Sequence, residues 1–448
     1  MIYNNKKVIY DSNMEDKNIN ITSKELDNTP IDNNNESKQD IVKTLPTSNE
    51  PTTQLPSKNR LDKYLDSMPL WQRIVIVTIL CALILIIIFL GVWIFVFQRP
   101  ISPASIIDTS KGYIEYAVTN SSQLFNVIYK DPSLPKTEVS PLNGLLFTKD
   151  EMTKLKEKSP VAVMINNHTA ARPQSGLSNA DIIYETVAES GITRYMAIFW
   201  SEAPNKVGPI RSARQYYLEW LSEYDPIYIY DGCAQTDDPR TNACGNIYTY
   251  AIKNMRTIGA WRISERVAPH NEYSSVQYAV DYAKRVNWGG FSTKIQSLKF
   301  KRDAAISDRG DKTKVRVKFR TDIPNGGMYD TEWNYDKSLN TYSYKVGGSA
   351  NYDMENKEPI RAKVVVIQEV NMINANDGKA RVIITTIGEG KAVILQDGKI
   401  IEGKWKKTSR TDRTKYYDSK GNEIELNRGL LWISAVPKDY GEFDIIEK

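Results

Sequence analysis

Asp181-Ile-Ile-Tyr-Glu-Thr-Val-Ala-Glu-Ser-Gly-Ile-Thr-Arg-Tyr-Met-Ala-Ile-Phe-Trp200 is the stretch that decides the fold of the larger folded region. Two runs rich in β-branched and aromatic residues flank the dipeptide Ser190-Gly191, a pattern typical of a β-hairpin. With Ser190-Gly191 as a two-residue turn, the alternation of side chains places Glu185, Glu189 and Arg194 on one face of the hairpin.

This face of the hairpin is a candidate site. Val187 would lie directly opposite Arg194, so the arginine would be diagonal to both glutamates and within reach of them. Two carboxylates held by an arginine suit acid–base catalysis or a cationic ligand. The alternative is a cross-strand ion-pair cluster without chemistry, and this is the interpretation that we favour.

Regular patterns on both sides of the hairpin predict an α/β layered domain. A buried strand is predicted at Val161–Ile165. Behind the hairpin, the sequence predicts a helix from Arg211 to about Tyr224 and a strand at Ile227–Tyr230. Ser274 then caps a helix from Val276 to about Val286. Farther along, the pattern is mostly β, with strands at Val364–Val370, Arg381–Thr386, Lys391–Leu395 and Leu430–Val436.

The composition divides the chain into five parts. The first 73 residues hold few large apolar side chains and cannot offset the entropy of ordering, so disorder is expected there. The predicted parts are a disordered cytoplasmic tail (1–73), a transmembrane helix (74–97), a stalk (98–140), an α/β domain (141–292) and a smaller, mostly-β domain (293–448).

The transmembrane prediction rests on Ile74–Val96, which is 23 residues long and carries no charge. As a helix it spans roughly 34 Å, enough for a hydrocarbon core of about 30 Å. Trp71 and Trp93 lie near its ends, where aromatic rings prefer the membrane interface. A buried core helix does not need so long a run, and a cleaved signal peptide would be shorter and nearer the N-terminus. We therefore predict an uncleaved signal-anchor.

Basic residues near the span predict its orientation. Lys58, Arg60, Lys63 and Arg73 precede it, whereas only Arg99 and Lys111 follow closely. By the positive-inside rule, the N-terminus is cytoplasmic and the folded domains are extracytoplasmic. In that oxidising compartment Cys233 and Cys244 could form a disulfide, with two free thiols as the alternative.

The segment Gly208-Pro-Ile-Arg-Ser-Ala-Arg214 predicts a binding site for an anion. It would place Arg211, Ser212 and Arg214 in the first turn of the predicted helix, where free N–H groups and the helix dipole attract negative charge. Arginines usually occupy the other end of a helix. Something negative should therefore bind here, either a ligand or the glutamates of the hairpin.

His270 lies in Ala268-Pro-His-Asn-Glu-Tyr273, directly before a helix cap, and is a candidate general base. A structural role for His270 is the alternative. A nucleophilic Cys233 paired with a histidine competes with the disulfide. The chain lacks HExxH, CxxC and GxSxG motifs and a Gly-rich phosphate loop, so neither a metal nor a cofactor is expected. Its net charge of +5 is spread among both signs, which argues against nucleic acid as a partner.

An ordered series of motifs resembles the YerB-like lipoprotein family of bacteria. The resemblance implies a two-domain extracytoplasmic protein tethered to the membrane, and it supplies no activity. Family members often carry an N-terminal lipid, where this chain has a predicted transmembrane helix. The motifs are Asn166-Asn167, Ala171–Leu177, Ala180–Glu185, Gly191–Arg194, Val207–Arg214, Ala268–Asn271, Gln396–Trp405 and Asn427–Trp432.

The leading functional prediction is a non-enzymatic binding or scaffold protein of the cell envelope. Its ligand would be anionic, such as a peptidoglycan fragment or another envelope polymer. The alternative is a cell-wall hydrolase or transferase that uses Glu185 or Glu189 with His270. A third possibility is a protein-binding module whose interface is the β-rich domain. The predicted ligand-binding residues are Arg172, Arg194, Arg211, Ser212, Arg214 and Asn271.

Overall fold

The computed structural model describes residues 68–72, 74–75, 78–79, 82–84, 104–108, 113–117, 135–311, 314–324 and 326–446. The chain forms two units, Met1–Phe95 and Val96–Lys448. The predicted cytoplasmic tail up to residue 67 and most of the predicted transmembrane span lie outside the described residues. Within the stretches that are described, no helix is long and apolar enough to cross a bilayer.

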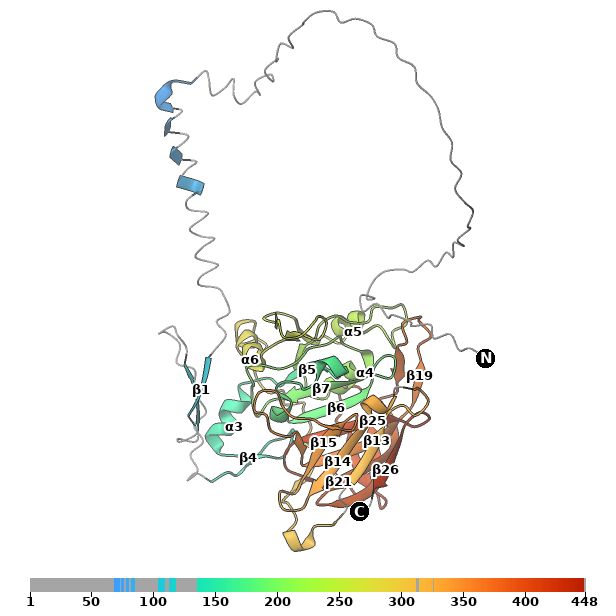
Figure 1. Ribbon diagram of the computed structural model, residues 1–448. Helices are drawn as coiled ribbons and strands as arrows, with labels where there is room; N and C mark the ends of the chain where they lie inside the picture. Colours follow the sequence, from blue (N-terminus) through green and yellow to red (C-terminus); the bar gives the residue numbers. More distant parts are fainter. Residues whose placement is uncertain are drawn as a thin grey trace, which may run out of the picture. The chain divides into compact units, whose positions relative to one another are not determined.

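A ten-stranded sheet forms the centre of the second unit, in the order β23-β22-β21-β18-β25-β6-β7-β5-β8-β9 (Figure 1). Strands β5, β6, β7 and β25 are buried along their whole length, as expected for apolar runs covered on both faces. The N-terminal strands are β5 Val161–Asn166, β6 Ile182–Val187, β7 Thr193–Phe199, β8 Ile227–Ile229 and β9 Lys253–Arg256. The C-terminal strands are β18 Val364–Val370, β21 Gly388–Gln396, β22 Lys399–Lys407, β23 Lys415–Asp418 and β25 Leu431–Pro437.

The sheet is continuous between the N-terminal α/β region and the C-terminal, mostly-β region. Strand β25 pairs in parallel with β6, from Leu431 opposite Ile182 to Ser434 opposite Glu185. On its other side, β25 pairs in parallel with β18. A strand close to the C-terminus therefore completes a sheet that the N-terminal region begins.

A second, six-stranded sheet comes entirely from the C-terminal region, in the order β16-β15-β14-β13-β26, with β17 beside β15. Its strands are β13 Lys314–Lys318, β14 Thr331–Asp336, β15 Thr341–Val346, β16 Ser349–Ala350, β17 Arg361–Ala362 and β26 Glu442–Ile446. The short paired strands are β1 Ala104–Asp108, β2 Tyr113–Ala117, β3 Glu138–Val139, β4 Leu146–Phe147, β10 Trp261–Arg262, β11 Glu272–Tyr273, β12 Phe300–Lys301, β19 Met372–Asn374, β20 Val382–Ile384 and β24 Leu426–Asn427. The helices are α3 Lys149–Lys156, α4 Gln215–Leu221, α5 Ala243–Thr249 and α6 Val276–Arg285.

Aromatic side chains fill both sides of the central sheet. On one side Trp220 of α4 stacks on Tyr184, with ring centroids 5.2 Å apart. On the other side Trp432 of β25 contacts Tyr195 of β7 and Tyr344 of β15, at 5.4 and 4.5 Å between centroids. The six-stranded sheet thus packs on the face of the central sheet opposite to α4. The expected α/β character of the N-terminal region and mostly-β character of the C-terminal region are confirmed.

The predicted cap of helix α6 is off by one residue, because Ser275 and not Ser274 is its N-cap. Two predictions near the hairpin are also wrong. The hairpin exists, but Thr186 lies opposite Arg194 and Val187 lies opposite Thr193, one residue away from the predicted register. Ala188 then bonds to Ile192, which leaves a three-residue loop in place of the two-residue turn. Since a slip of one residue exchanges the faces of a strand, Arg194 lies on the face opposite to that of Glu185.

The second wrong prediction concerns the start of the helix behind the hairpin. Helix α4 begins at Gln215, and Arg214 is its N-cap residue without a side-chain capping bond. Before it, the chain is extended, because Ile210 forms a β-bridge with Ile165 and Ala213 forms one with Cys233. Arg211 and Ser212 therefore belong to this extended segment and not to a helical turn.

Candidate functional site

Three of the resemblance motifs meet at the C-terminal end of strand β5. The segment after Gly208 runs beside the strand, with the Asn166 N–H donating to the carbonyl of Pro209 at 2.8 Å. The Arg211 N–H donates to the carbonyl of Met164 at 2.9 Å. The segment before α6 joins from the other side, where the carbonyl of Glu272 accepts from Ile210 at 2.7 Å.

The two histidines of the chain stack on each other at this meeting point. The rings of His168 and His270 have centroids 4.4 Å apart and are inclined by 19°. Asn166 holds both, since its Oδ1 accepts the backbone N–H of His168 at 2.9 Å while its Nδ2 lies 2.9 Å from Nδ1 of His270. His270 alone was predicted from the sequence as a site residue, and its stacking on His168 was not.

These bonds decide which ring nitrogens carry protons. The backbone N–H of His168 fixes Oδ1 of Asn166, so the amide N–H donates to Nδ1 of His270. The backbone N–H of Ala170 likewise donates to Nδ1 of His168 at 3.1 Å. In both neutral rings the proton is therefore on Nε2, and the pair presents two Nε2–H donors.

Arginines surround the histidine pair with positive charge. Burial, together with the charges of Arg211 and Arg172, lowers the pKa of His168. Burial, followed by the charges of His168, Arg211 and Arg266, lowers the pKa of His270 to about 4. Both rings are therefore neutral at physiological pH. We call His168, His270, Arg211 and Arg266 the His–Arg surface, and all four side chains are partly exposed.

Arg266 also ties down the loop that carries the first histidine. Its guanidinium donates to the carbonyls of Ala171 and Pro173, both at 2.6 Å. Arg172 is held more firmly, because it donates to Oδ1 of Asn167 at 2.9 Å and to the carbonyl of Met328 at 3.1 Å. Arg172 therefore links the site to the C-terminal region.

A pair of carboxyl groups lies beside the His–Arg surface. Arg262 of β10 forms ion pairs with Glu272 of β11 and, at 3.6 Å, with Asp231. Its guanidinium also donates to Oδ1 of Asn271 at 3.0 Å, which places that predicted residue at the edge of the site. Burial raises the pKa of Glu272, and the adjacent Asp231 carboxyl raises it further.

Arg194 and Arg214 belong to a different cluster. Both guanidiniums contact Oε1 of Glu189 at 2.7 Å, and Arg194 also donates to the carbonyl of Ser212. These charges lower the pKa of Glu189 to about 2 although its burial acts in the opposite direction. The contacts of both arginines with Glu189 match the ion-pair cluster, and Ser212 contributes its backbone carbonyl to it.

Glu185 lies in a third place, between the two sheets, and is fully buried. Its carboxyl group accepts hydrogen bonds from Trp432 Nε1 at 3.0 Å, the Tyr344 hydroxyl at 3.1 Å and the Thr193 hydroxyl at 3.2 Å. Burial raises its pKa to about 8 despite these bonds. The predicted pairing of Glu185 with Glu189 through Arg194 is therefore wrong.

Cys233 and Cys244 form a disulfide with Cα atoms 5.2 Å apart. The bond ties the strand-end loop of Asp231 to helix α5. Among the described residues, no group of three or more His, Cys, Asp and Glu side chains could hold a metal ion.

Asp231, Arg262, Arg266 and Glu272 were not predicted from the sequence. One signal was available for Asp231, because the Asp-Gly dipeptide directly follows a predicted strand, where functional side chains often gather. Arg262 and Glu272 lie in the paired strands β10 and β11, of only two residues each, and Arg266 lies in the loop between them. Such short strands leave no periodic pattern in the sequence.

Comparison with known proteins defines the family. The curated "Putative lipoprotein YerB" of Bacillus subtilis (strain 168) is 32% identical over 310 residues, which cover 68% of this chain and 88% of that protein. The chain belongs to the YerB-like family. Residues 147–289 match the family model "Protein of unknown function (DUF3048) N-terminal domain", and residues 321–433 match the model of the corresponding C-terminal domain.

A solved structure supports the same relationship. The crystal structure of YerB from Bacillus subtilis has a TM-score of 0.58 and 29% identity, covering 69% of this chain and 100% of that chain. The His–Arg surface lies wholly within the YerB-like N-terminal match, whereas Trp432 and Tyr344, which bind Glu185, lie in the C-terminal match. Because the family description states no function, membership supplies no reaction.

Proposed function

We propose that this chain is a binding protein of the bacterial cell envelope, anchored in the membrane, whose His–Arg surface recognises an anionic ligand on the extracytoplasmic side. The name of the Bacillus relative supports the envelope location, and the predicted span of Ile74–Val96 supports the anchor. Peptidoglycan, whose stem peptides carry carboxylates, is the ligand that we propose to test first.

The stacked histidine pair is the observation that carries this proposal. Two Nε2–H donors lie beside the positive charges of Arg211 and Arg266 on a partly exposed surface. Neutral N–H donors next to guanidiniums bind carboxylate or phosphate oxygens through charge-assisted hydrogen bonds. The loops at the end of β5 present these groups on a rigid sheet, which favours binding without large rearrangement.

Binding to sedimentable peptidoglycan sacculi tests the proposal. The full-length protein, purified in detergent, should cosediment with sacculi, and the double variant Arg211→Ala/Arg266→Ala should lose at least tenfold in affinity. Arg302→Ala/Lys399→Ala removes the same charge from exposed positions outside the surface and should bind like the wild type. Equal binding by the two double variants, or no binding by the wild type, would contradict the proposal.

For the enzymatic alternative, the structure offers a pair of carboxyl groups other than the predicted Glu185 and Glu189. Asp231 and Glu272 share Arg262, and Glu272 follows His270 by two residues in the chain, whereas Glu185 and Glu189 are each held by other partners. A carboxyl group with a raised pKa, that of Glu272, next to a second carboxyl group suits general acid–base chemistry on a glycan or peptide bond. Release of soluble fragments from sacculi by the wild type, abolished in Glu272→Gln, would favour a hydrolase. If no fragments are released, binding without catalysis is the function that the experiment supports.

A further inference from the structure

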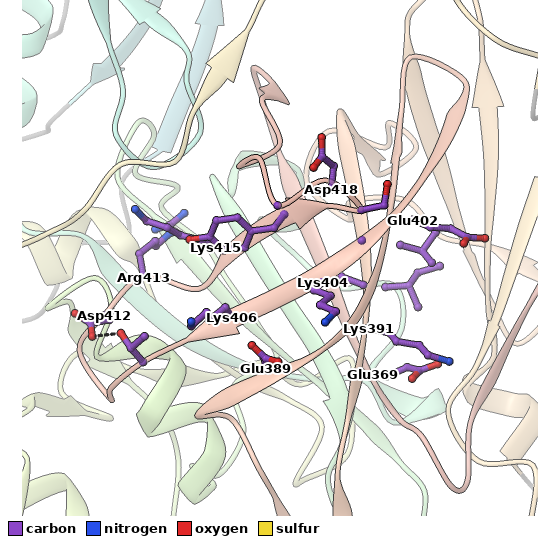
Figure 2. A pocket seen from close by; sticks show the side chains of 18 of the residues that line it. Glu369, Glu389, Lys391, Glu402, Lys404, Lys406, Asp412, Arg413, Lys415 and Asp418 are labelled. Atoms are coloured by element: carbon purple, nitrogen blue, oxygen red, sulfur yellow. Dashed lines mark hydrogen bonds between the residues drawn. The ribbon is translucent and has the colours of Figure 1, made fainter.

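The far end of the central sheet carries a second surface with concentrated charge, distant in sequence from the His–Arg surface. A cavity of about 970 Å³ lies over strands β18, β21, β22 and β23. This volume is at the upper end of the range of about 300–1,000 Å³ for ligand sites. Figure 2 shows lysine and glutamate side chains of these strands lining it.

Several of these charges are used inside the protein. Arg413 is buried against Glu223 and the ring of Tyr224. Asp412 accepts from the Thr408 hydroxyl at 2.5 Å, and Asp418 accepts from the backbone of its own turn. These residues shape the cavity but do not offer free charge to a ligand.

Among the described residues, the remaining charges that line the cavity form no ion pair with one another. We call the set of Lys391, Lys404, Lys406 and Lys415, with Glu369, Glu389 and Glu402, the lysine groove. Lys391, Lys404 and Lys406 are exposed, and no carboxylate among the described residues lies within 4.0 Å of their ammonium groups. Lys415 has one weak contact, 3.8 Å from Glu423.

The register of the strands sets like charges against each other. Lys391 lies directly opposite Lys404, and Lys406 lies directly opposite Lys415. Like charges at directly opposite positions destabilise a sheet. On its other side Lys406 lies opposite Glu389, whereas Lys404 has Tyr417 there. The repulsion between Lys391 and Lys404 therefore has no opposite charge directly across from Lys404, and a bound anion would relieve it.

The acidic residues decide what kind of anion fits. Glu369 and Glu389 lie on the β18 and β21 side of the groove, whereas Lys406 and Lys415 lie on the β22 and β23 side. Lys391 lies on β21 and Glu402 lies on β22, so charges of both signs occur on each side of the groove. A uniformly anionic polymer would meet the glutamates as well as the lysines and would be repelled by them.

The floor of the groove is apolar, and a ligand that fits the groove should therefore also carry apolar groups. It is formed in part by Ile367 and Val393, which lie opposite each other, and by Tyr417, which lies opposite Lys404. A polypeptide can offer carboxylates to the lysines and apolar side chains to this floor. We propose that the lysine groove is a docking surface for an acidic, extended segment of a partner protein.

Fluorescence anisotropy with a defined probe tests the docking surface. The probe is a labelled twelve-residue peptide in which glutamate alternates with threonine and leucine, and its counterpart has glutamine at every glutamate. The full-length protein in detergent at low salt should bind the acidic peptide and not its neutral counterpart. Lys404→Gln/Lys406→Gln should lower the affinity at least tenfold. Lys399→Gln/Lys438→Gln removes equal charge at exposed positions outside the groove and should leave binding unchanged.

Three results would overturn the proposal: absence of binding to the acidic peptide, equal loss in the two double variants, or displacement of the peptide by inorganic polyphosphate at lower concentration than by unlabelled peptide. The last result would identify a polyanion site. Because the groove does not depend on the proposed function, Arg211→Ala/Arg266→Ala should bind the peptide like the wild type. Thermal unfolding confirms that each variant is folded, and Lys391→Gln provides an independent test of the same groove.

Discussion

The substitution Glu185→Gln should change how the stability of the protein depends on pH. Burial raises the pKa of Glu185 to about 8, so the folded protein keeps this proton at neutral pH. The unfolded chain loses it near the ordinary value of 4.5. As pH rises between these values, the unfolded state is favoured, and the wild type loses stability. At about 1.4 kcal/mol per pH unit, the whole interval corresponds to roughly 5 kcal/mol.

Glutamine reproduces the neutral carboxyl group without its proton equilibrium. Its carbonyl can accept from Trp432 Nε1, and its amide can donate to the hydroxyls of Tyr344 and Thr193. At pH 5 the variant should therefore match the wild type within about 1 kcal/mol, the net value of a typical hydrogen bond.

Guanidinium unfolding of the full-length protein between pH 5 and 8.5 measures the difference. The stability of Glu185→Gln relative to wild type should increase steadily with pH, by several kcal/mol in total. Glu402→Gln, at an exposed position of β22, is the control and should show a constant difference. A constant difference for Glu185→Gln as well would refute the reasoning, because Glu185 would then be ionised in the folded protein.

Three further predictions concern Glu189, His270 and the disulfide. Glu189→Gln should destabilise the protein by about 3 kcal/mol at pH 7, since it leaves the buried Arg194 unpaired, and unfolding in guanidinium measures this. Because the pKa of Glu189 is lowered to about 2, the wild type should also lose this contribution as pH falls from 4.5 towards 2, and the variant should not. The imidazole signal of His270 should titrate near pH 4 in NMR spectra, and Arg211→Ala should raise this pKa; a value near 6.5 in the wild type would contradict the assigned surroundings. Cys233→Ser/Cys244→Ser should lower the free energy of unfolding by about 2–3 kcal/mol, and an unchanged midpoint would show that the loop needs no cross-link.

The hairpin shows how far local patterns reach. Alternating β-branched and aromatic residues predicted both strands, but they could not fix where the turn begins. Ser190 and Gly191 both adopt positive φ, and the loop extends back to Glu189. The resulting slip of one residue moved Arg194 to the opposite face, and the predicted carboxylate pair disappeared with it.

Long-range pairing explains the other differences. The apolar spacing of Tyr217, Leu218 and Leu221 predicted helix α4, but the preceding residues are held by bridges to Ile165 and Cys233. Such bridges join residues far apart in the chain, so no local sequence pattern predicts them. The parallel pairing of β25 with β6 could not be predicted either, because the sequence pattern indicates where strands lie but not which strands pair.

Part of the site could nevertheless be predicted. His270, Asn271 and Arg211 were singled out from their surroundings in the sequence, and the fold brings them to one end of strand β5. Their partners Asp231, Arg262 and Glu272 come from a loop and two very short strands. The chemistry of the surface was therefore accessible from the sequence, but its geometry was not.

The histidine signals of the intact protein give the most direct test of the proposed binding surface. The chain has two histidines, so the imidazole region of an NMR spectrum of untagged protein contains signals from these two rings alone. Addition of soluble peptidoglycan fragments should shift both signals and raise the pKa of His270 above about 4, because a bound anion stabilises the protonated ring. Unchanged histidine signals at fragment concentrations that saturate binding would contradict recognition at the His–Arg surface.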